Sequence, residues 1–117
     1  EVYQPLLMPP KKIEVEFQKN VTDDADYKEA ISHSGVVFVE VYQSWCGPCQ
    51  CIKPALYKLS MDDESIKFVT AAADKVGALK EFAGKIKPLF IVYKAGAKKA
   101  TVEGVNGPKI FEAINSA

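Results

Sequence analysis

The apolar residues of this chain fall into short runs that are separated by polar turns. Three runs are almost wholly apolar and rich in β-branched side chains, and they span residues 36–42, 66–73 and 89–93. Runs of this length without polar alternation predict strands that are covered on both faces of a sheet. Residues 12–18 alternate instead, which predicts a strand with one buried face. Residues 98–103 follow a glycine-containing turn and predict the second strand of a hairpin.

Four helices are predicted between and after these strands. The first begins at Thr22 or Asp23, either of which can cap it, and runs to about His33. Gly35 follows where a left-handed residue commonly ends a helix. The other three span residues 48–61, residues 74–84 and the segment from Pro108 onward. The order β-α-β-α-β-α-β-β-α predicts an α/β fold, with a central mixed β-sheet flanked by helices on both faces.

The chain is long enough, at 117 residues, for one domain with its own core, which we assign to residues 12–117. Residues 1–11 contain three prolines around Leu6, Leu7 and Met8, a density that excludes a helix or a central strand. We expect an extended N-terminal arm there. The arm is either a disordered end or a segment whose apolar side chains dock on a partner.

The charge balance restricts the class of partner. Fifteen basic and fifteen acidic residues give a formal net charge of zero, which argues against nucleic acid or an anionic membrane as a ligand. No apolar run approaches the roughly 20 residues that cross a bilayer, and no signal peptide opens the chain. Three cysteines, two of them close together, do not form a secreted disulfide framework. We therefore expect a reducing, cytoplasmic compartment.

The chemistry of the chain is expected at Cys46 and Cys49. Cys46 lies after a central strand and at the start of a helix, where unpaired N–H groups and the helix dipole favour a thiolate. Cys49 is on the same helix face three residues later, and Gly47 and Pro48 suit the tight turn between them. A disulfide that closes so short a loop contributes only about 2 kcal/mol, so it suits a switch better than a structural link. The pattern predicts attack of Cys46 on a target disulfide and resolution by Cys49.

Two other interpretations of the cysteine pair remain open. It could be half of a zinc site, but Cys51 points to another side of the helix and the only histidine, His33, is distant in sequence. It could also be an idle remnant of a retained fold. We expect no metal and no cofactor, a plain packing role for Cys51, and a helix-dipole role for His33.

Glu40 is the one charged residue in the central run 36–42. A buried carboxylate is costly, so we expect Glu40 to be protonated or hydrogen-bonded, with a raised pKa. It is either the proton acceptor for Cys49 or one member of an ion pair with a lysine. Trp45, just before the cysteines, is predicted to form an apolar lip beside the site, with a plain packing role as the alternative.

These residues resemble the thioredoxin family, over residues 12–117. The pentapeptide 45–49, Trp-Cys-Gly-Pro-Cys, matches the active-site motif of that family in full. The resemblance implies a thioredoxin fold, with Cys46 as nucleophile and Cys49 as resolving thiol. It also implies that Trp45, Gly47 and Pro48 contact the target.

The resemblance implies further site residues outside the pentapeptide. Glu40 stands where the family has a buried aspartate, and Thr70 where a lysine commonly faces that acid. Lys87 and Pro88 stand at the family's cis-proline, whose backbone binds target peptides, and Gly104 at the glycine that completes the target groove. Lys87 replaces an apolar residue and would add positive potential near the thiols.

A narrower resemblance is carried by residues 39–46, 73–74 and 87–90. These strings are similar to the thioredoxin-type light chains of axonemal outer-arm dynein, and to thioredoxin domains fused to nucleoside diphosphate kinase modules in cilia and sperm. The resemblance implies a light chain of the ciliary or flagellar axoneme, bound to the dynein heavy chain or another dynein subunit, with a redox-active site for regulating the motor. The alternative is a free cytosolic thioredoxin, a general protein-disulfide reductase that is recharged by thioredoxin reductase.

Overall fold

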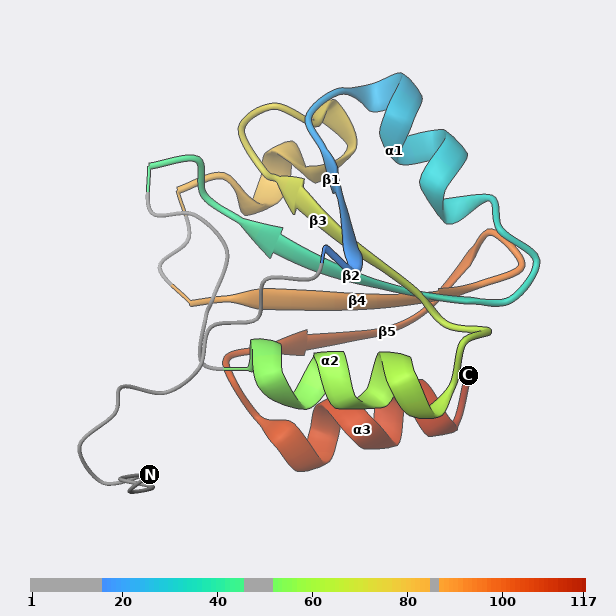
Figure 1. Ribbon diagram of the computed structural model, residues 1–117. Helices are drawn as coiled ribbons and strands as arrows, with labels where there is room; N and C mark the ends of the chain where they lie inside the picture. The colour runs from blue at the N-terminus through green and yellow to red at the C-terminus, as the bar shows by residue number, and fades with distance from the viewer. Residues whose placement is uncertain (1–15, 46–51, 85–86) are drawn as a thin grey trace, which may run out of the picture.

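The computed structural model describes residues 16–45, 52–84 and 87–117, and the fold is built from these ranges. They form one five-stranded sheet in the order β1-β3-β2-β4-β5 (Figure 1). Strand β1 pairs parallel with β3 and β3 pairs parallel with β2, whereas β4 pairs antiparallel with both β2 and β5. The strands are β1 Gln18–Val21, β2 Val36–Tyr42, β3 Lys67–Ala72, β4 Leu89–Lys94 and β5 Ala97–Glu103. The predicted mixed sheet is confirmed.

Helices cover both faces of this sheet (Figure 1). One face carries α1 (Asp24–Ile31) and the short 3-10 helix η1 (Gly77–Phe82), and the other carries α2 (Lys53–Asp62) and α3 (Gly107–Asn115). Helix α1 begins as predicted, because the side chain of Asp23 accepts a hydrogen bond from the N–H of Asp26. This arrangement confirms the α/β fold with helices on both faces of the sheet.

Alternation along the central strands divides the core into two clusters. Val37, Val39 and Val41 of β2 point to the α1 face, where the cluster is mainly aliphatic. Phe38 points to the α2–α3 face, where its ring stacks on that of Phe90 with centroids 5.5 Å apart. All residues of β2 between its two ends are buried, as expected for a strand with neighbours on both edges and helices on both faces.

One buried polar pair interrupts the aliphatic cluster. The hydroxyl oxygens of Tyr27 in α1 and Tyr93 in β4 lie 2.5 Å apart, and the two rings meet edge to face. Burial raises the pKa of Tyr27 and that of Tyr93 above their usual value. Both phenols therefore stay protonated and neutral at physiological pH, and one hydroxyl donates to the other.

Three details differ from the predictions. The first strand begins at Gln18, where the predicted strand ends, because its pairing with β3 runs over residues 18–21; residues 12–15 of the predicted strand lie outside the described residues. Helix α1 ends at Ile31 with Ser32 as its cap in a right-handed conformation, so Gly35 has no left-handed role. The predicted helix after Asp74 is a 3-10 helix, followed by Gly84 at φ +82°.

Candidate thiol–disulfide site

The predicted site residues that the structure describes lie in β2 or close in sequence or contact to its carboxyl end. Strands β2 and β3 run parallel and end on the same side of the sheet (Figure 1). The N–H of Ala73 donates to the carbonyl of Tyr42 at 2.8 Å, which carries the pairing of these two strands past their ends. Open α/β sheets place their sites at this carboxyl edge, because the chain leaves the sheet there in loops. Cys46, Gly47, Pro48 and Cys49 follow directly in sequence, together with Cys51, but they lie outside the described residues.

Ser44 and Asp74 connect the two chain segments that leave the sheet. The hydroxyl of Ser44 donates to Oδ1 of Asp74 at 2.7 Å, and the N–H of Ser44 donates to the same oxygen at 3.3 Å. The hydrogen bond from Ser44 holds the pKa of Asp74 below its usual value. The carboxylate is thus ionised at neutral pH and fixes the backbone immediately before Trp45.

Gln43 makes a second connection, to the loop that follows η1. Its side chain is only 7% exposed, and both of its polar ends are bonded to backbone. Nε2 donates to the carbonyl of Phe82 at 3.0 Å, and Oε1 accepts from the N–H of Gly84 at 3.0 Å. Gln43 belongs to the string 39–46 that resembles dynein light chains, but the sequence predicted no role for its side chain. Its hydrogen-bond partners are about forty residues away in the chain.

Pro88 and Gly104, which the resemblance assigned separately to the target groove, lie next to each other. The N–H of Gly104 donates to the carbonyl of Pro88 at 2.7 Å. Gly104 has φ +79°, a left-handed conformation that favours glycine. Pro88 immediately precedes Leu89, which pairs with Val41 near the end of β2. The described residues contain no cis peptide bond, so the implied cis bond between Lys87 and Pro88 is not found.

Trp45 and Lys87 are both on the surface. The side chain of Trp45 is 72% exposed, so it does not pack into the core; the lip interpretation stays a prediction. Lys87 is exposed as well. We use the term target face for Trp45, Lys87, Pro88 and Gly104, the described residues that were predicted to contact a target.

Glu40 is buried behind this face, on the α2–α3 side of β2. It is 1% exposed and lies directly between Thr70 of β3 and Phe90 of β4 in the register of the sheet. The amide Nε2 of Gln18 in β1 is 3.4 Å from its Oε1. The predicted neighbour Thr70 is therefore confirmed, and Gln18 is a partner that the sequence did not indicate. The predicted rise in the pKa of Glu40 stays a prediction.

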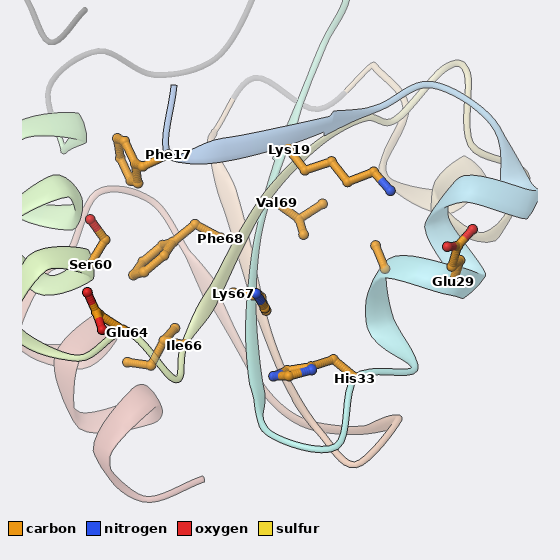
Figure 2. Close-up of a pocket in the computed structure, with 11 residues that line it drawn as sticks. Phe17, Lys19, Glu29, His33, Ser60, Glu64, Ile66, Lys67, Phe68 and Val69 are labelled. Atoms are coloured by element: carbon orange, nitrogen blue, oxygen red, sulfur yellow. The ribbon is translucent and has the colours of Figure 1, made fainter. Parts of the chain in front are cut away.

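A separate pocket of about 570 Å³ lies at the other end of β3 (Figure 2). Figure 2 shows α1, β1, β3 and the end of α2 around it. None of the predicted site residues that the structure describes lines this pocket. His33, which was predicted to be a helix-dipole partner, does line it. Its other lining residues are Phe17, Lys19, Glu29, Ala30, Ser60, Glu64, Ile66, Lys67, Phe68 and Val69.

Within the described ranges, no group of three or more His, Cys, Asp or Glu side chains is arranged to hold a metal ion. No helix in the same ranges is both long and apolar enough to cross a membrane.

The fold and the residues at its carboxyl edge define a class of protein. The family model described as Thioredoxin matches residues 18–116. Because the match covers most of the chain, this protein belongs to the thioredoxin family, and its sheet and helices are the thioredoxin fold. Among solved structures, Plasmodium falciparum thioredoxin is 31% identical with a TM-score of 0.67, and the match covers 84% of this chain and 97% of that one.

The relatives by sequence include subunits of a motor. The 14 kDa light chain of flagellar outer-arm dynein from Chlamydomonas reinhardtii is 36% identical over 98 residues, which are 80% of this chain and 76% of the relative. The 16 kDa light chain of the same outer arm is 33% identical over 105 residues, 85% of this chain and 67% of the relative. A thioredoxin domain-containing protein 3 homolog from Heliocidaris crassispina is 32% identical, and this chain spans 13% of its length.

Proposed function

We propose that this protein is a thioredoxin-type light chain of outer-arm dynein, located in the cytoplasm at the axoneme of cilia or flagella. It would bind the dynein heavy chain or another dynein subunit. The observation that carries the proposal is its similarity to two outer-arm light chains over most of both chains. The residues 39–46, which include Gln43, are part of the sequence string that resembles such light chains.

We further propose that the light chain is redox-competent. The pentapeptide 45–49 follows a buried central strand, at the sheet edge where α/β proteins carry their sites. Ser44 and Gln43 anchor the backbone just before the pentapeptide, and Glu40 is buried in the strand that precedes it. A rigid support of this kind suits a site that must hold reacting groups in a fixed geometry.

The proposed reaction transfers two electrons to a protein disulfide. The thiolate of Cys46 attacks one sulfur of the target disulfide; that S–S bond breaks, a mixed disulfide forms, and the second target sulfur leaves as a thiolate and takes up a proton. Cys49 gives its proton to the carboxylate of Glu40 and attacks the sulfur of Cys46. The first target sulfur leaves as a thiolate, and the chain retains a Cys46–Cys49 disulfide. An external dithiol reductant such as thioredoxin reductase would restore both thiols.

A second function is favoured by the match to a free thioredoxin. The Plasmodium protein is matched over 97% of its length, so this chain contains what a free thioredoxin needs for its fold. In that case the protein is a general cytosolic protein-disulfide reductase with many unrelated targets, and its similarity to light chains reflects ancestry alone.

The two functions are separated by capture from a ciliary lysate. Tagged wild type and Cys49→Ser are pulled down side by side, with and without reductant. Dynein subunits that bind both forms and resist reductant would support the light chain. Many unrelated proteins that bind only Cys49→Ser, and that reductant releases, would support the general reductase and contradict the light chain.

The thiol chemistry is tested independently of the partner. We expect Cys46→Ser to abolish multiple-turnover reduction of a protein disulfide, because no nucleophile forms the mixed disulfide, while Cys49→Ser accumulates that intermediate. Insulin reduction and mass spectrometry of the trapped adduct measure the two effects. Retained turnover in Cys46→Ser would contradict the assigned role.

A further inference from the structure

The buried amide of Gln43 is the feature that the proposed reaction does not explain. Buried polar side chains are nearly always hydrogen-bonded, commonly to backbone. Here both ends of one amide bind the same short loop: Nε2 donates to the carbonyl of Phe82, and Oε1 accepts from the N–H of Gly84. One side chain therefore ties two backbone groups that are two positions apart and leaves no polar atom of the amide end unpaired.

Among the described residues, the loop bound by Gln43 is not part of a strand, and few other hydrogen bonds hold it. It follows η1, and the strand pairing of the chain resumes only at Leu89. The N–H of Ala83 donates to the carbonyl of Lys80, which continues the helical turn but does not reach the sheet. The two bonds to Gln43 thus join this loop to the end of β2. Gly84, at φ +82°, adopts a turn that few other residues adopt without strain.

Gln43 also stands between the two halves of the target face. In sequence it precedes Trp45 by two positions, while the loop that it binds leads to Lys87 and Pro88. Figure 1 shows the loop after η1 running beside the end of β2. The two hydrogen bonds, each 3.0 Å long, consequently fix the spacing between the chain that enters the pentapeptide and the chain that enters Pro88.

We propose that Gln43 is a positioning residue that sets the spacing across the target face, and thereby the preference of the site for disulfides carried by polypeptides over small disulfides. A polypeptide must contact both sides of the face, whereas a small disulfide needs only the thiols. The inference rests on the proposed thiol chemistry. Displacements of about 1 Å in positioning groups alter rates strongly, so a loop held by one amide is sensitive to its loss.

The first test measures the hydrogen bonds without any activity. Gln43→Met keeps the length of the side chain but can neither donate to Phe82 nor accept from Gly84. We expect amide hydrogen exchange at Gly84 to become at least about tenfold faster in this variant. Tyr93→Phe is the matched control, because it removes a buried hydrogen bond from the core cluster on the α1 face. An unchanged Gly84 rate in Gln43→Met, or equal acceleration in the control, would overturn the positioning role.

The second test measures specificity. We expect Gln43→Met to raise KM for a protein disulfide by about three- to tenfold relative to KM for a small aromatic disulfide. Gln43→Glu, which keeps an acceptor for Gly84 but lacks the amide N–H that donates to Phe82, should shift the ratio in the same direction. Equal changes in both KM values, or a change only in proportion to lost thermal stability as in Tyr93→Phe, would contradict the proposal.

The two tests separate this inference from the proposed function. If the wild type reduces no disulfide, the redox proposal fails, and the exchange rate of Gly84 still decides whether Gln43 positions the loop. If Gln43→Met does not fold, Gln43→Glu, which keeps an acceptor for Gly84, supplies the KM ratio. If the wild type is active and the KM ratio is unchanged in both variants, the specificity role of Gln43 is wrong.

Discussion

Two buried pairs of polar side chains among the described residues, Tyr27 with Tyr93 and Gln18 with Glu40, lie on opposite faces of the same sheet and differ in kind. Tyr27 and Tyr93 form a short contact between two neutral hydroxyls, 2.5 Å apart, within an aliphatic cluster. Gln18 and Glu40 form a longer contact of 3.4 Å between an amide and an ionisable carboxyl group. The first pair is fully explained by mutual satisfaction, whereas the second keeps an acid in the interior behind the target face.

The two pairs differ in how much burial of their polar groups costs in stability. A buried hydroxyl that finds a partner contributes about 0.5–1.5 kcal/mol to stability. A buried carboxyl group is stabilising only when its surroundings fully compensate for lost hydration, and apolar replacements of such groups are often neutral or better. We therefore expect the tyrosine pair to serve stability and Glu40 to serve the thiol chemistry. Three predictions test this contrast, and a fourth extends it to the exposed pair Ser44 and Asp74, from the largest expected effect to the smallest.

The largest effect is expected from Glu40→Leu. Loss of the proposed proton acceptor should slow release of the target from Cys46 by about 10²-fold, since general-base catalysis contributes factors of that order. The free energy of unfolding should stay equal or rise by about 1–4 kcal/mol, because a buried acid is replaced by an apolar side chain of similar size. Rapid quench of the mixed disulfide and urea unfolding measure the two effects. Thr70→Val, beside Glu40, is the control for local repacking; a clear loss of stability with unchanged release would reverse the assignment.

Tyr27→Phe should act in the opposite way. It leaves the hydroxyl of Tyr93 buried without its partner, so the free energy of unfolding should fall by about 1–3 kcal/mol. Disulfide reduction should be unaffected, because the pair lies in the α1-face cluster and away from the target face. The double variant Tyr27→Phe/Tyr93→Phe should be less destabilised than the sum of the two single ones. Additive losses would show that the hydroxyls do not stabilise each other.

The tyrosine pair should also make the fold sensitive to alkali. Burial raises the pKa of Tyr27 and of Tyr93, so folding favours their protonated forms. The contribution of the two tyrosines to the free energy of unfolding is fully present below about pH 10, the pKa of an unfolded tyrosine. It is lost as the pH rises toward and through the raised pKa values of the folded protein. Above pH 10 the wild type should lose up to about 1.4 kcal/mol per pH unit for each tyrosine, relative to the double phenylalanine variant. Parallel stability curves for the two proteins would refute the linkage.

The smallest effect is expected from Ser44→Ala. The variant removes the hydroxyl that donates to Asp74, and the pKa of Asp74 should rise toward its usual value. The carboxylate is exposed, so stability at neutral pH should change little. Because the pKa of Asp74 is lower in the folded state, Asp74 adds to stability at pH values above its unfolded pKa, and this contribution is lost as the pH falls through the folded pKa. The free energies of unfolding of wild type and variant should therefore differ in their pH dependence only under acidic conditions. An NMR titration of Asp74 measures the shift, and an unchanged pKa would assign it to another cause.

Much of the fold could be predicted from the local pattern of apolar, polar and capping residues. The apolar run 36–42 is β2 to the residue, and Asp23 caps α1, because burial and capping are recorded directly in residue type. The start of β1 was misplaced, since alternation in 12–18 identifies a strand but not its pairing partner. The helix after Asp74 was predicted in its place, but its tighter 3-10 form depends on packing rather than on periodicity.

The sequence by itself determined the fold class, the position of the pentapeptide after a central strand, and the burial of Glu40, because each follows from the order of apolar runs. Tertiary structure alone decided which groups meet: Gln18 with Glu40, Gln43 with the Phe82–Gly84 loop, and Gly104 with Pro88. These contacts join residues that are far apart in sequence. Strand order and register decide which residues meet in these contacts. Every residue type has a backbone, so the sequence does not reveal which backbone group a side chain will bind.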